Sequence, residues 1–108
     1  MGSFIQGAPS NSEKLMTFIV TKAFTIPASM AGSKAYAQVA STAAATINVI
    51  KNGAAASGTI DFAIATNAAT FTFGSPVAFV VGDRLQLENQ ATSDATLADI
   101  SITIRGDL

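Results

Sequence analysis

Few side chains in this sequence could do chemistry, because its 108 residues include no histidine and no cysteine. Histidine is the commonest general base, and histidine and cysteine together supply the usual zinc ligands. Carboxylates remain, and Asp61 with Glu88 could form the acid pair of a glycosidase. Both fall on polar positions of expected strands, where a carboxylate is normally solvated. We therefore predict a protein that is not an enzyme and has no catalytic residue, no cofactor and no metal ion.

Oxygen-bearing side chains in the expected turns suggest a calcium site as an alternative. These residues are Asn67, Asp83, Asn89, Asp94 and Asp99. Their spacing follows no repeating ligand pattern, and Asp and Asn favour turns because they hydrogen-bond to nearby backbone. Tyr36 is the single tyrosine and tryptophan is absent, which leaves little material for an aromatic sugar platform. The polar residues are better interpreted as turn formers.

The chain is poor in charge. Charged residues make up 12 % of it, hydrophobic residues 49 %, and the formal net charge is −1. The charged share is about half that of an ordinary domain. This balance gives no steering toward nucleic acid or a membrane surface, and no segment has the length of a membrane span. A surface built from Ala, Ser, Thr, Asn and Gly favours packing against copies or a partner, with a neutral-surfaced monomer as the alternative.

The chain divides into an N-terminal arm over residues 1–14 and one domain over residues 15–108. The first segment is rich in Gly, Ser, Pro and Asn, which is typical of an arm and not of a core element. Phe4 and Ile5 are its apolar residues and are the expected partner-binding anchors. The arm packs either on its own domain or on a neighbour, and we favour the neighbour.

Asn52-Gly53 is a strong signal for a tight hairpin turn of type I′. If Lys51 pairs with Ala54 across it, Ile47 opposes Gly58 and directly opposed residues share a face. One face of the hairpin then carries the apolar side chains, and a slip of one residue would destroy this pattern. The apolar set is Ile47, Val49, Ile60, Phe62 and Ile64.

Similar alternation predicts the remaining strands. Residues 15–26 form one strand ended by Pro27, and residues 66–69 and Gly82-Asp83 are turns, the latter of two or three residues, joining neighbouring strands. Residues 35–45 favour strand over helix despite their alanines, and residues 100–105 form the last strand. The total is about eight short strands, which favours an all-β fold, an antiparallel β-sandwich or jelly roll, with a small barrel as the second choice.

Four elements occur in a characteristic order within residues 15–106. They are Lys51-Asn52-Gly53, Gly58-Thr59-Ile60-x-Phe62, Gly82-Asp83-Arg84-Leu85, and the run DATLADISIT at residues 94–103. This order resembles a group of small domains in bacteriophage structural proteins, found alone or at the ends of tail and fibre chains. The resemblance implies a β-sandwich, a component of the virion and no catalytic residues.

The leading hypothesis is a virion accessory protein, most simply a capsid decoration or cement protein that binds itself, as a dimer or trimer, and the major capsid protein. Deleting residues 1–12 is then expected to abolish particle binding while the domain stays folded. The alternative is a module of a tail fibre or head spike that binds a host glycan. The sequence chooses neither the head nor the tail and does not fix the oligomeric state.

Overall fold

The computed structural model describes residues 2–30, 32–54, 56–74, 76–91, 94 and 96–107, with the backbone alone at residues 2–4, 30 and 56. They form ten strands and one short 3-10 helix, and they contain no α-helix. The strands are β1 (Gly2–Ile5), β2 (Lys14–Ile19), β3 (Phe24–Ile26), β4 (Lys34–Val39), β5 (Ala45–Lys51), β6 (Ala56–Phe62), β7 (Thr70–Thr72), β8 (Val77–Phe79), β9 (Arg84–Asn89) and β10 (Ala98–Thr103), and the 3-10 helix is Ala28–Met30.

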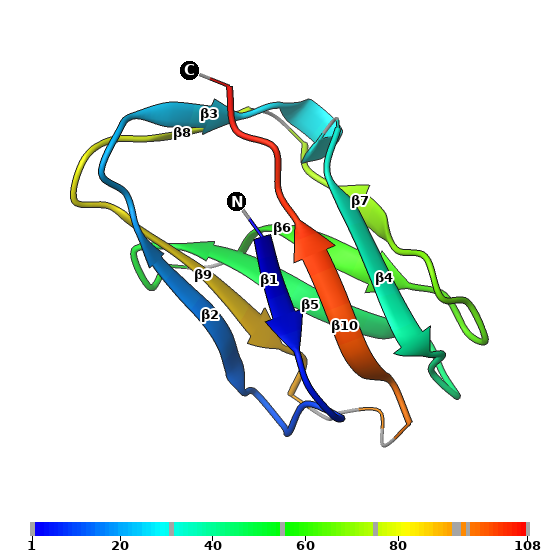
Figure 1. The fold of residues 1–108 in the computed structure, drawn as a ribbon. Helices are drawn as coiled ribbons and strands as arrows, with labels where there is room; N and C mark the ends of the chain where they lie inside the picture. Colours follow the sequence, from blue (N-terminus) through cyan, green and yellow to red (C-terminus); the bar gives the residue numbers. More distant parts are fainter. Residues whose placement is uncertain are drawn as a thin grey trace.

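Two antiparallel sheets face each other in a sandwich-like arrangement (Figure 1). The three-stranded sheet has the order β1-β10-β4 and the five-stranded sheet has the order β2-β9-β5-β6-β7, while β3 and β8 form a separate ribbon at one end. The connection between β6 and β7 crosses to the smaller sheet, where Ala37 N donates to Asn67 O at 2.8 Å and Ala69 N donates to Ala35 O at 3.0 Å. The predicted all-β, antiparallel fold class is confirmed.

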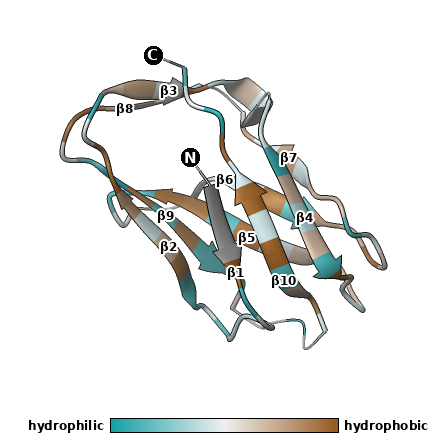
Figure 2. Cartoon of the chain, in the orientation of Figure 1, coloured by the Kyte–Doolittle hydropathy of each residue, from teal (hydrophilic) through white to brown (hydrophobic). Residues whose placement is uncertain are grey.

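The core lies between the two sheets, where alternate residues of each strand point inward. Ile100, Ile102 and Ile104 are at most 2 % exposed, and between them stand Ser101 and Thr103, which are exposed. Figure 2 shows this alternation along β10. Strands β5 and β9 face them with a second set of fully buried side chains, Ile47, Val49, Leu85 and Leu87. Each such aliphatic residue contributes roughly 1.5–3 kcal/mol through burial.

The Asn52-Gly53 turn forms as predicted, and φ is positive at both residues, +54° and +72°. The pairing beyond the turn differs from the prediction by two residues, because Ile47 opposes Ile60 and Val49 opposes Gly58. A register shift between Val49 and Ile50 accounts for one of these residues, and the other is already present where Ile50 pairs with Ala56. An even shift keeps every side chain on its predicted face, so the inward pattern of the hairpin survives the error.

Ile64 is the exception to the predicted apolar face, since it is 61 % exposed. The β6–β7 ladder pairs Ile60 with Phe71 and Asp61 with Thr70, so the connection is longer than the predicted turn at residues 66–69. The longer connection is the segment that reaches across to β4, and Ile64 lies on it, outside the core.

The strands around residue 80 pair differently from the prediction. The stretch 15–26 is two strands, and β3 pairs with β8, whereas β2 pairs with β9. The turn before β9 therefore joins two different sheets. The aromatic rings of Phe24 and Phe79 stack with centroids 5.2 Å apart, a long-range contact that favours the β3–β8 ribbon over a local hairpin.

The first residues are part of the sandwich, and the predicted arm over residues 1–14 is wrong at β1. Gly2 to Ile5 pair with Thr103 to Ile100, and the side chain of Ile5 is 8 % exposed within the core. Burial of an apolar side chain outweighs the coil-forming composition of its neighbours. The segment is held by its own domain here, where we favoured a neighbour.

Candidate functional site

One end of the sandwich exposes three branched aliphatic side chains. Ile19 is 52 % exposed, Val80 is 59 % exposed and Val81 is 67 % exposed. They share this end because the β2–β3 and β8–β9 connections bond to each other: Val20 N donates to Asp83 O at 2.9 Å and Gly82 N donates to Val20 O at 2.8 Å. These connections meet on the left of Figure 1. We call Ile19, Val80 and Val81 the apolar end.

A shallow depression of about 230 Å³ adjoins the apolar end at Val80. Its lining includes the stacked rings of Phe24 and Phe79, with Ala23 and Ala78 beside them. The ammonium of Lys51 lies 5.4 Å from the centroid of the Phe79 ring. The apolar surface thus continues from the three aliphatic side chains onto the β3–β8 ribbon.

The four residues predicted as structural turns are Asn52, Gly53, Gly82 and Asp83, and the two turns are joined through Asn52, which bonds to Asp83 and Arg84. Asn52 N donates to Arg84 O at 2.9 Å, Arg84 N donates to Asn52 Oδ1 at 2.8 Å, and Asn52 Nδ2 donates to Asp83 Oδ1 at 3.0 Å. Asp83 Oδ2 also accepts from Val80 N at 2.9 Å. The hydrogen bond from Asn52, followed by that from Val80, lowers the pKa of the Asp83 carboxyl. The two turns hold the backbone that carries the valines.

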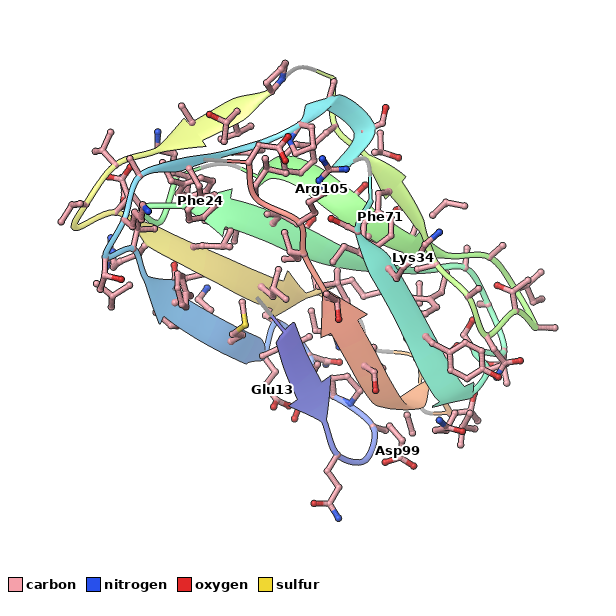
Figure 3. All side chains as sticks on the ribbon, turned by 45° about the horizontal axis from the view of Figure 1, so that its top comes forward. Glu13, Phe24, Lys34, Phe71, Asp99 and Arg105 are labelled. Atoms are coloured by element: carbon pink, nitrogen blue, oxygen red, sulfur yellow. The ribbon has the colours of Figure 1, made fainter. Side chains whose placement is uncertain are left out.

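The remaining acidic residues of the turns and strands are used by the chain itself. Asp94 Oδ2 accepts from Thr42 N, Thr42 Oγ1 and Ala43 N, and Oδ1 accepts from Thr96 N, Thr96 Oγ1 and Leu97 N, all at 2.7–3.1 Å. Donation from Thr96 above all holds the pKa of this carboxyl far below its usual range. Asp99 Oδ1 accepts from Gly7 N at 2.8 Å beside the connection that follows β1 (Figure 3).

The two carboxylates considered as a catalytic pair are not neighbours. Asp61 lies on β6, where Thr46, Thr59 and Thr72 donate hydroxyl hydrogen bonds to it. Glu88 lies on β9, with β5 between the two strands, and pairs with Lys14. Within the described ranges, no three acidic, histidine or cysteine side chains gather as a metal-binding group.

Of the two predicted anchors, Ile5 lies in the core opposite Ile100, and Phe4 pairs with Ser101 through the backbone. In this fold Ile5 could reach another chain only if β1 left β10. The exposed aliphatic residues of the apolar end were not predicted as contacts. Their signal in the sequence is the run Val80-Val81 directly before Gly82-Asp83, since a turn leaves such side chains uncovered.

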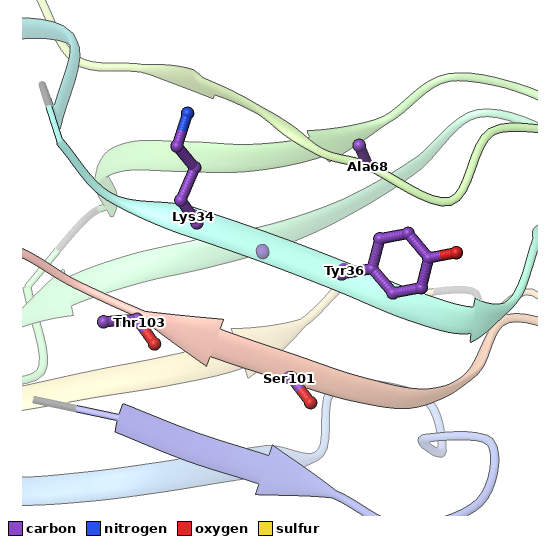
Figure 4. A pocket seen from close by; sticks show the side chains of 6 residues that line it. Lys34, Tyr36, Ala68, Ser101 and Thr103 are labelled. Atoms are coloured by element: carbon purple, nitrogen blue, oxygen red, sulfur yellow. The ribbon is translucent and has the colours of Figure 1, made fainter.

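A second surface lies on the outer face of the smaller sheet. Tyr36 is 49 % exposed on β4, and a shallow depression of about 270 Å³ beside it is lined by Lys34, Ala35, Tyr36, Ala68, Ser101 and Thr103 (Figure 4). The alternation of exposed Lys34 and Tyr36 with buried Ala35 and Ala37 marks this face in the sequence. The neighbouring strand β10 lies far away in the chain, so the sequence does not show the complete surface.

Comparison of the chain with protein families, with curated proteins and with solved structures gives no match in any of the three. No helix among the described residues is long and apolar enough to cross a membrane. The described residues offer two candidate contact surfaces, the apolar end and the Tyr36 face.

Proposed function

We propose that this chain is an accessory structural protein of a bacteriophage particle, most simply a capsid decoration protein that binds itself and the assembled shell. The observation that carries the proposal is the apolar end, where Ile19, Val80 and Val81 are each more than half exposed. A cluster of exposed aliphatic side chains is a common mark of a protein contact. The resemblance of residues 15–106 to small domains of phage structural proteins supports the virion as the place of that contact.

The apolar end suits rigid docking. Its valines stand on a turn closed by the hydrogen bond from Asp83 N to Val80 O at 3.0 Å and braced by Asn52. A contact surface that is already ordered loses little conformational entropy on binding. Burying a branched aliphatic side chain contributes roughly 1.5–3 kcal/mol, so burying these three side chains in an interface contributes favourably to the free energy of binding.

A decoration protein stabilises a shell by mass action, because it binds the assembled form and not the free subunits. The low charge of the chain, 12 % of its residues, reduces repulsion between copies placed side by side. Self-association into dimers or trimers would repeat the apolar end two or three times and increase the avidity of the assembly.

The test is to purify the source particles and to quantify this protein by mass spectrometry against the major shell protein. A copy number close to that of the shell protein supports decoration. A handful of copies per particle indicates that the protein belongs to the tail or a spike. Absence from the particles contradicts the proposal.

A host-glycan-binding module is a second candidate, and the Tyr36 face is the observation in its favour. Tyrosine supplies an aromatic platform, and the hydroxyls of Ser101 and Thr103 lie beside it in the same depression. A glycan array probed with the wild-type chain and with Tyr36→Ala tests this candidate. Binding that disappears in the variant supports it, and an array without hits contradicts it.

A further inference from the structure

The Tyr36 face places four side chains in a square. Tyr36 on β4 directly opposes Ser101 on β10, and Lys34 directly opposes Thr103. Directly opposed residues on one face have Cβ atoms roughly 4.5–5.5 Å apart, and all four side chains are exposed. Figure 4 shows them together on the outer side of the sheet.

Strand β4, which carries Lys34 and Tyr36, is hydrogen-bonded along both of its edges. β4 pairs with β10 on one edge, and Tyr36 forms a bridge with Ala68 on the other. Asn67 Nδ2 adds a hydrogen bond of 2.8 Å to Ala37 O. β4 is the outer strand of its sheet, but the hydrogen bonds of Ala35 and Ala37 to residues 67–69 hold its free edge, which suits a preorganised platform.

The polar atoms of the square are available to a ligand. Among the described residues, the side chains of Lys34, Tyr36, Ser101 and Thr103 make no hydrogen bond, in contrast to the carboxylates of Asp61, Asp83 and Asp94. The ion pairs within the described ranges use Lys14, Lys51 and Arg105, and none of them uses Lys34. An exposed ammonium on the same sheet face as two unused hydroxyls can bind an anionic, hydroxyl-rich molecule.

The size and the charge of the depression define the ligand class. Its volume of about 270 Å³ lies below the roughly 300–1,000 Å³ of pockets for drug-sized molecules, which suits a single sugar ring. Tyr36 can stack on the apolar C–H face of a pyranose, and Ser101 and Thr103 can exchange hydrogen bonds with its hydroxyls. Among the described residues that line the depression, Lys34 is the one that carries a charge.

We infer that the Tyr36 face is a subsite for a sugar that bears a carboxylate, with Lys34 binding the carboxylate and Tyr36 stacking on the ring. This inference rests on the second candidate function, glycan binding, and names the class of glycan. A single exposed subsite of this kind binds weakly, with a Kd of about 1 mM or above, and repetition in an oligomer would raise the avidity.

The test is an NMR titration of the ¹⁵N-labelled full chain with glucuronate, galacturonate and N-acetylneuraminate, each compared with glucose or galactose. We expect at least one acidic sugar to shift the amides of residues 34–36 and 101–103, with an affinity at least threefold above that of the neutral sugars. Lys34→Gln should remove this preference, and Tyr36→Ala should abolish the shifts. Lys22→Gln, which changes an exposed lysine in the β2–β3 connection, is the control and should change neither.

The possible outcomes distinguish the carboxylate preference of the subsite from glycan binding in general. Equal shifts from acidic and neutral sugars at these amides overturn the carboxylate preference and leave glycan binding standing. Acidic shifts that persist in Lys34→Gln overturn the role of the lysine. If none of the sugars shifts these amides while the glycan array finds a ligand, the site is wrong; if the array is empty as well, the second candidate function fails with it.

Discussion

The side-chain amide of Asn52 bonds to the carboxylate of Asp83, with Nδ2 and Oδ1 3.0 Å apart, and thereby joins two turns that lie 31 residues apart in the sequence. Asn52 Oδ1 accepts from Arg84 N at 2.8 Å in the same contact. Lys51 extends it with an ion pair to Asp83 at 3.8 Å and a hydrogen bond to Ala78 O at 2.7 Å. One hairpin turn therefore supports the loop that carries Val80 and Val81.

Asn52→Ala should lower the free energy of unfolding by about 2–5 kcal/mol. It removes two side-chain hydrogen bonds, each worth roughly 0.5–1.5 kcal/mol, and it places alanine at a φ of +54°, which costs roughly 1–2 kcal/mol. Urea unfolding measures the sum. Asn52→Gly is the matched variant, because glycine tolerates this φ and loses the hydrogen bonds alone. Equal stability of wild type and Asn52→Ala would refute the turn-to-turn contact.

Stability should fall with acid below about pH 4. The folded pKa of Asp94 is lowered by Thr96 first and then by Thr42 and Leu97, and that of Asp83 is lowered by Asn52. The unfolded chain, with aspartate near its usual pKa of about 3.9, therefore takes up protons first as the pH falls, and this favours unfolding. Above that pKa both carboxylates contribute in full. Thermal unfolding from pH 7 to pH 2 should show the loss.

Two variants test whether Asp94 causes this loss of stability in acid. Asp94→Asn should lower Tm at pH 7 and flatten the decline at low pH, since it no longer exchanges a proton. Thr96→Val keeps the shape of residue 96 but removes the 2.7 Å hydroxyl donation, and it should give a smaller change in the same direction. An unaltered pH profile in Asp94→Asn would contradict the assignment.

Gly58→Ala should be strongly destabilising. A Cβ at this position would lie 1.7 Å from Cδ1 of Phe73 and 2.6 Å from the backbone oxygen of Thr72, and Phe73 is 4 % exposed in the core. Forcing an added methyl group into a packed core costs roughly 1–3 kcal/mol, and more where backbone is in the way. Gly74→Ala is the control, since its added Cβ would meet nothing within 4 Å. Chemical unfolding of both variants should separate them clearly.

Val81→Asp should weaken binding of the purified protein to particles that lack it by at least tenfold, because it places a charge in the apolar contact. Val81 is 67 % exposed, so the fold should not change. Ile64→Asp introduces the same charge at a side chain that is 61 % exposed on the β6–β7 connection, and it should bind as the wild type does. Co-sedimentation with particles measures both, and equal loss in the two variants would point to a general charge effect.

Local features of the fold could be predicted from the sequence. The Asn52-Gly53 turn follows from residues that accept positive φ, and the alternation of Ile100, Ile102 and Ile104 follows from the side-chain period of two. The face of the sheet to which each side chain points is predicted more reliably than the pairing register. The hairpin register differs by two residues, yet Ile47 and Phe62 face the core as predicted.

Long-range pairings could not be predicted in the same way. β8 pairs with β3 because Phe79 meets Phe24, and no local pattern encodes that contact. Ile5 joins the core because β10 offers it a partner 95 residues along the chain. The Tyr36 face was missed for the same reason, since its hydroxyls come from β10 and its tyrosine comes from β4.

The central position of β10 in the smaller sheet sets the order in which the strands of that sheet can pair during folding. Strands β1 and β4 are both hydrogen-bonded to β10, which is the last strand in the sequence. During synthesis the β5–β6 hairpin and its neighbours can assemble early, but β1 and β4 wait with unpaired edges until β10 leaves the ribosome. Folding is then completed in a late step of high contact order, which is slow compared with hairpin formation, and the nascent chain is most open to aggregation before β10 has emerged.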